Sequence, residues 1–172
     1  IWAAALERRN RFKVRTRLYV DSDVTMLEVK SKDGRGRTLK HRIERSSSDR
    51  DHLSAEDRSF VDDVAPIALA DGLVATFTTR YLRTTVVDLD DGSRATVDQE
   101  LVCSDPDGRS VTVDRVIVET KSDGHASPLD RWLWQRGIRP VRISKYWTSL
   151  AVLHPDLPTN KWHRTIARHF VT

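Results

Sequence analysis

Lysine and arginine side chains recur at alternate positions along several segments that resemble β-strands. Lys13, Arg15 and Arg17 are separated by single apolar or small residues, so in a strand they would share one face. Guanidinium and ammonium groups gathered in this way make charge-assisted hydrogen bonds to phosphate oxygens. The spacing therefore predicts a site for a ligand that carries several negative charges.

Six segments show the same phasing, with charged residues on one face and mostly apolar residues on the other. The basic members are Lys13, Arg15, Arg17, Lys30, Lys32, Lys40, Arg42, Arg83, Arg94 and Lys121, and the acidic members are Glu28, Glu44, Asp98 and Glu119. Such alternation is also typical of a sheet with one solvated face. The dominance of cations favours a different arrangement, in which they line a closed interior and a polyanion offsets their repulsion.

Carboxylates among these cations have two interpretations. They either hold Mg²⁺ or Mn²⁺, which commonly bridge carboxylate and phosphate, or they form salt bridges with neighbouring cations. Glu119 and Glu28 are the candidate metal ligands, and the salt bridge is the alternative for both. Other chemistries lack support, because the sequence contains no G-x-S-x-G and no H-E-x-x-H motif.

The charge of the chain is unevenly distributed. Residues 1–45 hold 13 Lys and Arg against 6 Asp and Glu, whereas residues 46–172 hold 16 against 19. This local basic excess fits a polyanion site, and by itself it fits nucleic acid or an acidic membrane equally well. The single cysteine, Cys103, excludes an internal disulfide and reads as a small core residue, which agrees with a cytoplasmic location.

The elements that must position these side chains are mainly strands. We expect an antiparallel sheet from strands at 11–20, 24–32, 38–44, 73–87, 93–103 and 111–121, with a bend or bulge in the fourth. Helices are expected at 54–64, 128–136, 144–153 and 161–170, the first of them capped by Ser54 and Asp57. The tryptophans of the helical tail are better explained by core packing than by base stacking. The expected class is α+β, mainly antiparallel β.

Seven segments, taken in order, resemble the VTC domain of the triphosphate tunnel metalloenzyme superfamily. They are 13–19 (KVRTRLY), 27–32 (LEVKSK), 38–42 (TLKHR), 81–84 (YLRT), 94–98 (RATVD), 118–121 (VETK) and 143–146 (ISKY). The resemblance implies an antiparallel β-tunnel with flanking helices. Residues 1–172 would form a single tunnel domain. The family's first strand and its Tyr-x-Asp-Thr-like segment have no counterpart here, so we expect the N-terminal part of the tunnel to be missing and residues 1–6 to end a helix or loop.

The resemblance also implies roles for individual residues. The implied catalytic residues are Arg15, Arg17, Lys30, Lys40, Arg83, Arg94 and Lys145, and the further substrate-binding residues are Lys13, Lys32, Arg42, Lys121 and Arg142. Glu119 matches the family's metal-binding glutamate, and Glu28 is the second metal candidate.

The implied reaction is metal-dependent transfer of the γ-phosphate of ATP to a growing polyphosphate chain by a bacterial member of the family. The partners would be ATP, triphosphate or polyphosphate, with Mn²⁺ or Mg²⁺ as cofactor and no nucleic acid. A membrane-protein partner would not be visible in this sequence. A triphosphatase and a non-catalytic polyphosphate-binding module are the alternatives, because the same cationic residues would serve all three.

Overall fold

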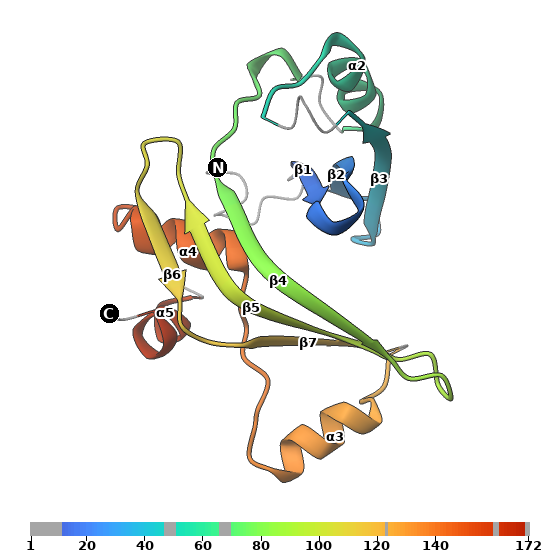
Figure 1. Cartoon of the computed structure of the whole chain (residues 1–172), viewed down its shortest axis with the longest axis vertical. Helices are drawn as coiled ribbons and strands as arrows, with labels where there is room; N and C mark the ends of the chain where they lie inside the picture. Colours follow the sequence, from blue (N-terminus) through green and yellow to red (C-terminus); the bar gives the residue numbers. More distant parts are fainter. Residues whose placement is uncertain (1–11, 47–50, 66–69, 123, 160–161, 171–172) are drawn as a thin grey trace. The chain divides into compact units, whose positions relative to one another are not determined.

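The computed structural model describes residues 12–46, 51–65, 70–122, 124–159 and 162–170. The chain divides into two compact units, Ile1–Ala75 and Thr76–Thr172. Both contain antiparallel strands and helices (Figure 1), so the predicted α+β class with mainly antiparallel sheets is confirmed. The expectation for residues 1–6 lies outside the described part of the chain. That residues 1–172 act as one domain stays a prediction.

The first unit contains a three-stranded sheet in the order β1-β2-β3. Its strands are β1 (Lys13–Tyr19), β2 (Val24–Lys32) and β3 (Thr38–Arg45). The short 3₁₀ turn η1 (Val20–Ser22) joins β1 to β2, and a second one, η3, spans Ala70–Gly72. The alternation of charged and apolar residues predicted these three strands to within two residues at each end, where the structure describes them.

Helix α2 (Ala55–Val64) covers the apolar face of this sheet. The helix begins at a capping box, in which Ser54 and Asp57 each accept a hydrogen bond from the other's backbone N–H. Val61 of the helix packs against Leu27 and Val29 of β2, and all three side chains are buried. Each buried aliphatic side chain of this kind contributes about 1.5–3 kcal/mol. The packing therefore fixes which face of the sheet is left for the charged residues.

The second unit contains a four-stranded sheet built around β5 (Arg94–Ser104). Strand β4 (Thr78–Val87) pairs with it along one edge. Strands β6 (Ser110–Val113) and β7 (Ile117–Lys121) pair with its C-terminal and N-terminal parts, respectively. The single strand expected at 111–121 is therefore wrong. The chain breaks at residues 114–116, which lets its two halves pair with different parts of β5.

A bulge in β5 decides which of its residues share a face. The β4–β5 register shifts between Arg80 and Leu82, and Glu100 has a positive φ of 53°. The extra residue changes the alternation, as β-bulges do, so that Asp98 and Leu101 lie in phase. As a result, one face of β5 is polar in its N-terminal half and apolar in its C-terminal half. The bend or bulge is expected in the strand at 73–87; the register does shift beside Arg80 and Leu82 of that strand, but the extra residue belongs to β5.

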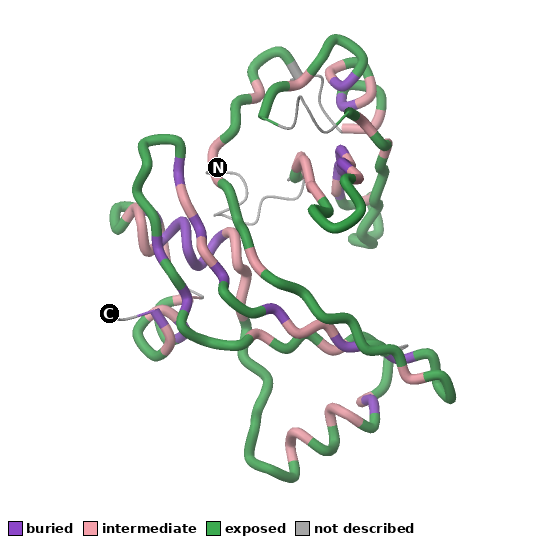
Figure 2. Tube along the Cα trace, in the orientation of Figure 1, coloured by how far each residue is buried: buried purple, intermediate pink, exposed green. Residues whose placement is uncertain are grey.

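Three helices complete the second unit: α3 (Pro128–Gln135), α4 (Lys145–Leu153) and α5 (His163–His169). Leu101 and Cys103 of β5 form a core with Val111, Val113 and Phe170. Cys103 is fully buried, as the sequence predicts for a small core residue. The expectation for the tryptophans holds only in part, because Trp147 on α4 is buried whereas Trp132 on α3 is 47% exposed. Figure 2 shows buried positions along α4, whereas α3 has none.

Each unit has an open sheet, and no sheet closes into a barrel within the described residues. A common channel lined by both sets of strands therefore stays a prediction. Among the helices of the described residues, none has the length and the hydropathy that crossing a lipid bilayer requires.

Candidate functional site

The register of the first sheet places the predicted cations in three rows across one face. Residues that lie directly opposite each other in antiparallel strands share a face, as do alternate residues within a strand. Cations outnumber carboxylates on this face, which is opposite to the one that α2 covers. The rows are Lys13, Lys30 and Lys40; Arg15, Glu28 and Arg42; and Arg17, Met26 and Glu44.

Glu28 occupies the centre of this face and is 1% exposed. Both of its carboxylate oxygens have cationic partners. Arg15 donates to Oε2 through Nε, and its Nη2 also approaches that oxygen. The Lys40 ammonium lies 2.5 Å from Oε1. Burial alone would raise the pKa of Glu28, but Lys40 and Arg15 lower it to about 2, so the carboxylate is ionised at neutral pH.

Lys13 shows how closely the cations of this face are packed. Partial burial, followed by the positive charges of Arg15, Lys30 and Arg17, lowers the pKa of Lys13 to about 8. An ordinary lysine titrates near 10.4. The positive charges therefore repel one another, and an anion bound on this face would relieve that repulsion.

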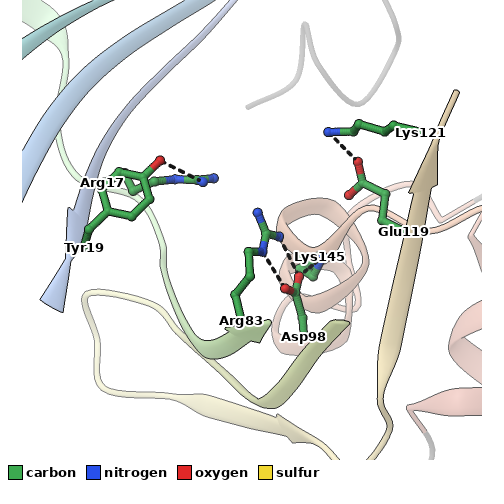
Figure 3. Close-up of polar contacts among 7 residues, drawn as sticks. All are labelled: Arg17, Tyr19, Arg83, Asp98, Glu119, Lys121 and Lys145. Atoms are coloured by element: carbon green, nitrogen blue, oxygen red, sulfur yellow. Dashed lines mark hydrogen bonds and ion pairs between the residues drawn. The ribbon is translucent and has the colours of Figure 1, made fainter. Parts of the chain in front are cut away.

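The second unit has a comparable arrangement around Asp98 of β5. The Asp98 side chain is 0% exposed and accepts two hydrogen bonds from Arg83 of β4, at 2.6 Å from Nε and 2.7 Å from Nη2. Lys145, the first residue of α4, places its ammonium 2.5 Å from Oδ2 of the same carboxylate. Figure 3 shows both cations directed at Asp98. Burial would raise the pKa of Asp98, but Arg83 and Lys145 hold it below its usual value.

An aromatic ring supports the same two cations. The Tyr81 ring centroid lies 5.0 Å from Cζ of Arg83 and 5.6 Å from Nζ of Lys145. Both distances are within the range of cation–π attraction. Tyr81 also packs against the apolar core of the unit, so the ring connects the cations to a rigid part of the fold.

Glu119 of β7 lies on the same face of the second sheet. It is opposite Thr96, and its neighbour Lys121 is opposite Arg94. The Lys121 ammonium is 3.0 Å from Oε1 of Glu119, whose side chain is 47% exposed (Figure 3). Burial would raise the pKa of Glu119, but Lys121, followed by Lys145 and Arg83, lowers it. Arg94, Glu119 and Lys121 thus extend the charged face that begins at Arg83.

The remaining predicted residues lie in less crowded positions. Arg17 contacts Tyr19 through Nη1, 3.4 Å from the phenolic oxygen. Lys32 donates to the backbone carbonyl of Gly36 in the β2–β3 turn. Arg142 lies in the irregular segment before α4, where it is exposed. These three residues are therefore not part of either carboxylate-centred cluster.

The two candidate metal ligands differ in how well they fit a divalent cation. Mg²⁺ and Mn²⁺ are usually held by one or two carboxylates together with substrate phosphates. Glu119 fits this pattern, because its carboxylate is half-exposed and has one lysine partner. Glu28 is enclosed by Arg15 and Lys40, and its metal role stays a prediction. The described residues contain no group of three or more His, Cys, Asp or Glu side chains placed to hold a metal.

A family model for the VTC domain matches residues 2–154 of this sequence. The match covers most of the chain, so the protein belongs to the VTC domain family, as the seven segments indicate. Neither a curated protein nor a solved structure matches the chain. Family membership associates the chain with polyphosphate metabolism and with divalent metal ions.

Sequence reasoning missed two features of these clusters. It placed Asp98 on the charged face by its phase but gave it no role, because the approach of Lys145 depends on tertiary packing. It also gave no role to Tyr81, although the Tyr-Leu-Arg spacing puts this ring on the same face as Arg83. Alternation along β4 was the signal that could have identified Tyr81.

Proposed function

We propose that the chain binds triphosphate and polyphosphate on these cationic faces and transfers the γ-phosphate of ATP to a growing polyphosphate chain. The central observation is the cross-strand register of the first sheet. It brings cations from three strands to one face. On this face burial, followed by the charges of Arg15, Lys30 and Arg17, lowers the pKa of Lys13 to about 8. An ordinary solvent-exposed sheet face mixes positive and negative residues and avoids this repulsion. An excess of cations is instead typical of a surface that binds a ligand with many negative charges.

The proposed reaction is an in-line displacement at phosphorus. A terminal oxygen of the chain forms a bond to the γ-phosphorus of ATP while the bond to the β–γ bridging oxygen breaks, and ADP leaves. Catalysis of this kind consists mainly of positioning and charge stabilisation. Arg15 and Arg83 would hold phosphate oxygens with their planar donors, while Lys30, Lys40 and Lys145 would add positive charge.

Glu119 would hold a divalent cation, Mn²⁺ or Mg²⁺, which supplies charge neutralisation at the transferred phosphate when it is bound. Arg94 and Lys121 flank this carboxylate on the same face of the sheet. They would bind the oxygens of the substrate that are not coordinated to the cation.

Product analysis with ATP and Mn²⁺ tests this proposal. The protein is expected to form polyphosphate, and Glu119→Gln is expected to reduce the rate by roughly 100-fold or more, because it removes the anionic ligand without changing the shape of the side chain. Glu100→Gln, at an exposed glutamate of the neighbouring strand, is the matched control and is expected to stay within about twofold of the wild-type rate.

The products also separate the alternatives. Release of inorganic phosphate from tripolyphosphate with no chain growth would indicate that the protein is a triphosphatase and not a polymerase. Tight, salt-sensitive binding without turnover under Mn²⁺ or Mg²⁺ would indicate a binding module. Displacement of polyphosphate by single-stranded or duplex nucleic acid would contradict the assignment of the ligand.

Lys13 gives the site a predictable pH dependence. A bound polyanion favours the charged form of Lys13 and so raises its pKa above the value of about 8 in the free protein. Binding above this pH therefore takes up a proton, and the affinity for long-chain polyphosphate falls by up to about tenfold per pH unit. Below this pH Lys13 is already protonated, and its contribution is constant. Calorimetry in buffers of different ionisation enthalpy measures the uptake, which Lys13→Met should abolish. Identical pH profiles for the two proteins would contradict this assignment.

A further inference from the structure

The two cationic clusters are built in the same way, although they lie in different units. Each is centred on a carboxylate of the strand in the middle of its sheet, Glu28 on β2 and Asp98 on β5. The preceding strand supplies an arginine: Arg15 faces Glu28 across β1–β2, and Arg83 faces Asp98 across β4–β5. A lysine from an element later in the chain contacts the other oxygen of Glu28 and the Oδ2 oxygen of Asp98.

The two contacts use the same guanidinium nitrogens, although Arg15 approaches one carboxylate oxygen and Arg83 approaches both. Both arginines approach their carboxylate with Nε and Nη2, and both side chains are 27% exposed. The Nη1 side of each guanidinium takes no part in these contacts. An arginine has five N–H donors in a fixed plane, so the carboxylate fixes the orientation of the group and leaves donors for a ligand.

The carboxylates themselves are almost inaccessible to an incoming ligand. Glu28 is 1% and Asp98 0% exposed, whereas their arginine partners remain partly accessible. Burying a carboxylate is costly unless cations and hydrogen bonds compensate for the lost hydration. A salt bridge on the protein surface keeps its carboxylate hydrated and avoids this cost. A metal ion at Glu28 would have to displace both of its cationic partners.

We propose that Glu28 and Asp98 are positioning residues, each of which holds one arginine and one lysine in a fixed geometry for phosphate oxygens. This inference rests on the proposed function and deepens it. It assigns Glu28 to the orientation of Arg15 and Lys40 instead of to metal binding, and it gives Asp98 the equivalent task for Arg83 and Lys145.

Neutral variants of the same shape separate this role from simple electrostatics. Glu28→Gln and Asp98→Asn each make the protein one unit more positive, so attraction between charges alone predicts tighter polyphosphate binding. Loss of positioning predicts the opposite, a dissociation constant raised by roughly tenfold or more, because the ligand must then order the two cations itself. Isothermal titration with long-chain polyphosphate in the full chain measures the difference. Tighter or unchanged binding in both variants would overturn the inference.

Controls keep the inference distinguishable from the proposed function. If the wild-type protein fails to bind polyphosphate, the proposed function is wrong; if it binds and both variants bind equally well, only the positioning role is wrong. The Mn²⁺ concentration for half-maximal activity should be unchanged in Glu28→Gln and raised in Glu119→Gln. An equal rise in both would make Glu28 a metal ligand and contradict the proposal.

A measurement on the unmodified chain covers the case in which a variant does not fold. In ¹⁵N NMR spectra at neutral pH, the Nε–H groups of Arg15 and Arg83 should exchange slowly with water, because a buried carboxylate accepts their hydrogen bonds. Arg80, an exposed residue on the opposite face of β4, is the internal reference and should exchange fast. Equal exchange rates at the three arginines would show that the carboxylates do not hold the guanidinium groups.

Discussion

Arg15→Ala and Arg83→Ala are each expected to lower the rate of polyphosphate formation by about 100-fold to 1,000-fold. Removing one preorganised donor from a site where charge develops typically has an effect of this size. The substitution removes a planar group that a buried carboxylate orients, and it leaves that carboxylate with a lysine as its partner. Steady-state assays with ATP and Mn²⁺ should show the loss mainly in kcat, because the proposed function gives each arginine the role of stabilising phosphate charge during the transfer.

Two exposed arginines provide matched controls for these variants. Arg35 lies in the β2–β3 turn of the first unit, and Arg80 lies on the opposite face of β4 from Arg83. Arg35→Ala and Arg80→Ala remove the same charge and should keep the rate within about twofold, since surface substitutions of this kind have small effects. Equal losses in test and control variants would mean that net charge determines the activity, and not the geometry within each cluster.

Asp57→Ala is expected to destabilise the first unit by about 3–5 kcal/mol, the usual cost of breaking a buried ion pair from one side. Asp57 Oδ2 lies 2.9 Å from Nη2 of Arg45, and both side chains are almost fully buried. The same oxygen accepts the backbone N–H of Ser54 in the capping box. The substitution therefore removes a carboxylate partner of a buried arginine, which still donates to the His52 carbonyl, and it removes the cap of α2. Native-state hydrogen exchange of the amides in α2 and β3 measures the free energy of opening.

Asp63→Ala is the matched control for this measurement. Asp63 is an exposed acidic residue near the C-terminal end of the same helix, so its removal should change the free energy by less than about 0.5 kcal/mol. A loss below about 1 kcal/mol in Asp57→Ala would show that the Arg45 pair does not stabilise the unit.

The sequence predicted the first sheet well because two independent patterns agree there. Charged and apolar residues alternate along β2, and the Asp33–Gly36 turn separates it from β3. Ser54 and Asp57 similarly define the start of α2 by local hydrogen bonds alone. Where local chemistry determines an element in this way, one sequence is enough to place its ends.

The second sheet was harder to predict because its features depend on distant contacts. No glycine or proline marks the break at residues 114–116, so β6 and β7 read as one strand. Strand β4 begins at Thr78, later than the expected residue 73, because β5 supplies pairing partners only from that point. Pairing with β5 determines both the break between β6 and β7 and the start of β4. The alternation of residues along the chain gives no information on this pairing.

The candidate site likewise combines features that local sequence predicts with features that depend on distant contacts. Period-two phasing correctly predicted that the cations of each strand share a face. It could not predict which carboxylate holds which cation, because Lys145 reaches Asp98 from a helix and Lys40 reaches Glu28 from a neighbouring row. The buried state of both carboxylates, and hence the difference between Glu28 and Glu119, emerged only from the packed structure.

A crystal structure of the protein with tripolyphosphate and Mn²⁺ tests the central claim most directly. Electron density for phosphate is expected within hydrogen-bonding distance of the Nη1 side of Arg15 or Arg83, with the Arg15–Glu28 and Arg83–Asp98 contacts intact. Anomalous scattering from manganese is expected beside Glu119. Tripolyphosphate bound away from both carboxylate-centred clusters, with Arg15 and Arg83 in contact only with solvent and their own carboxylates, would contradict the account.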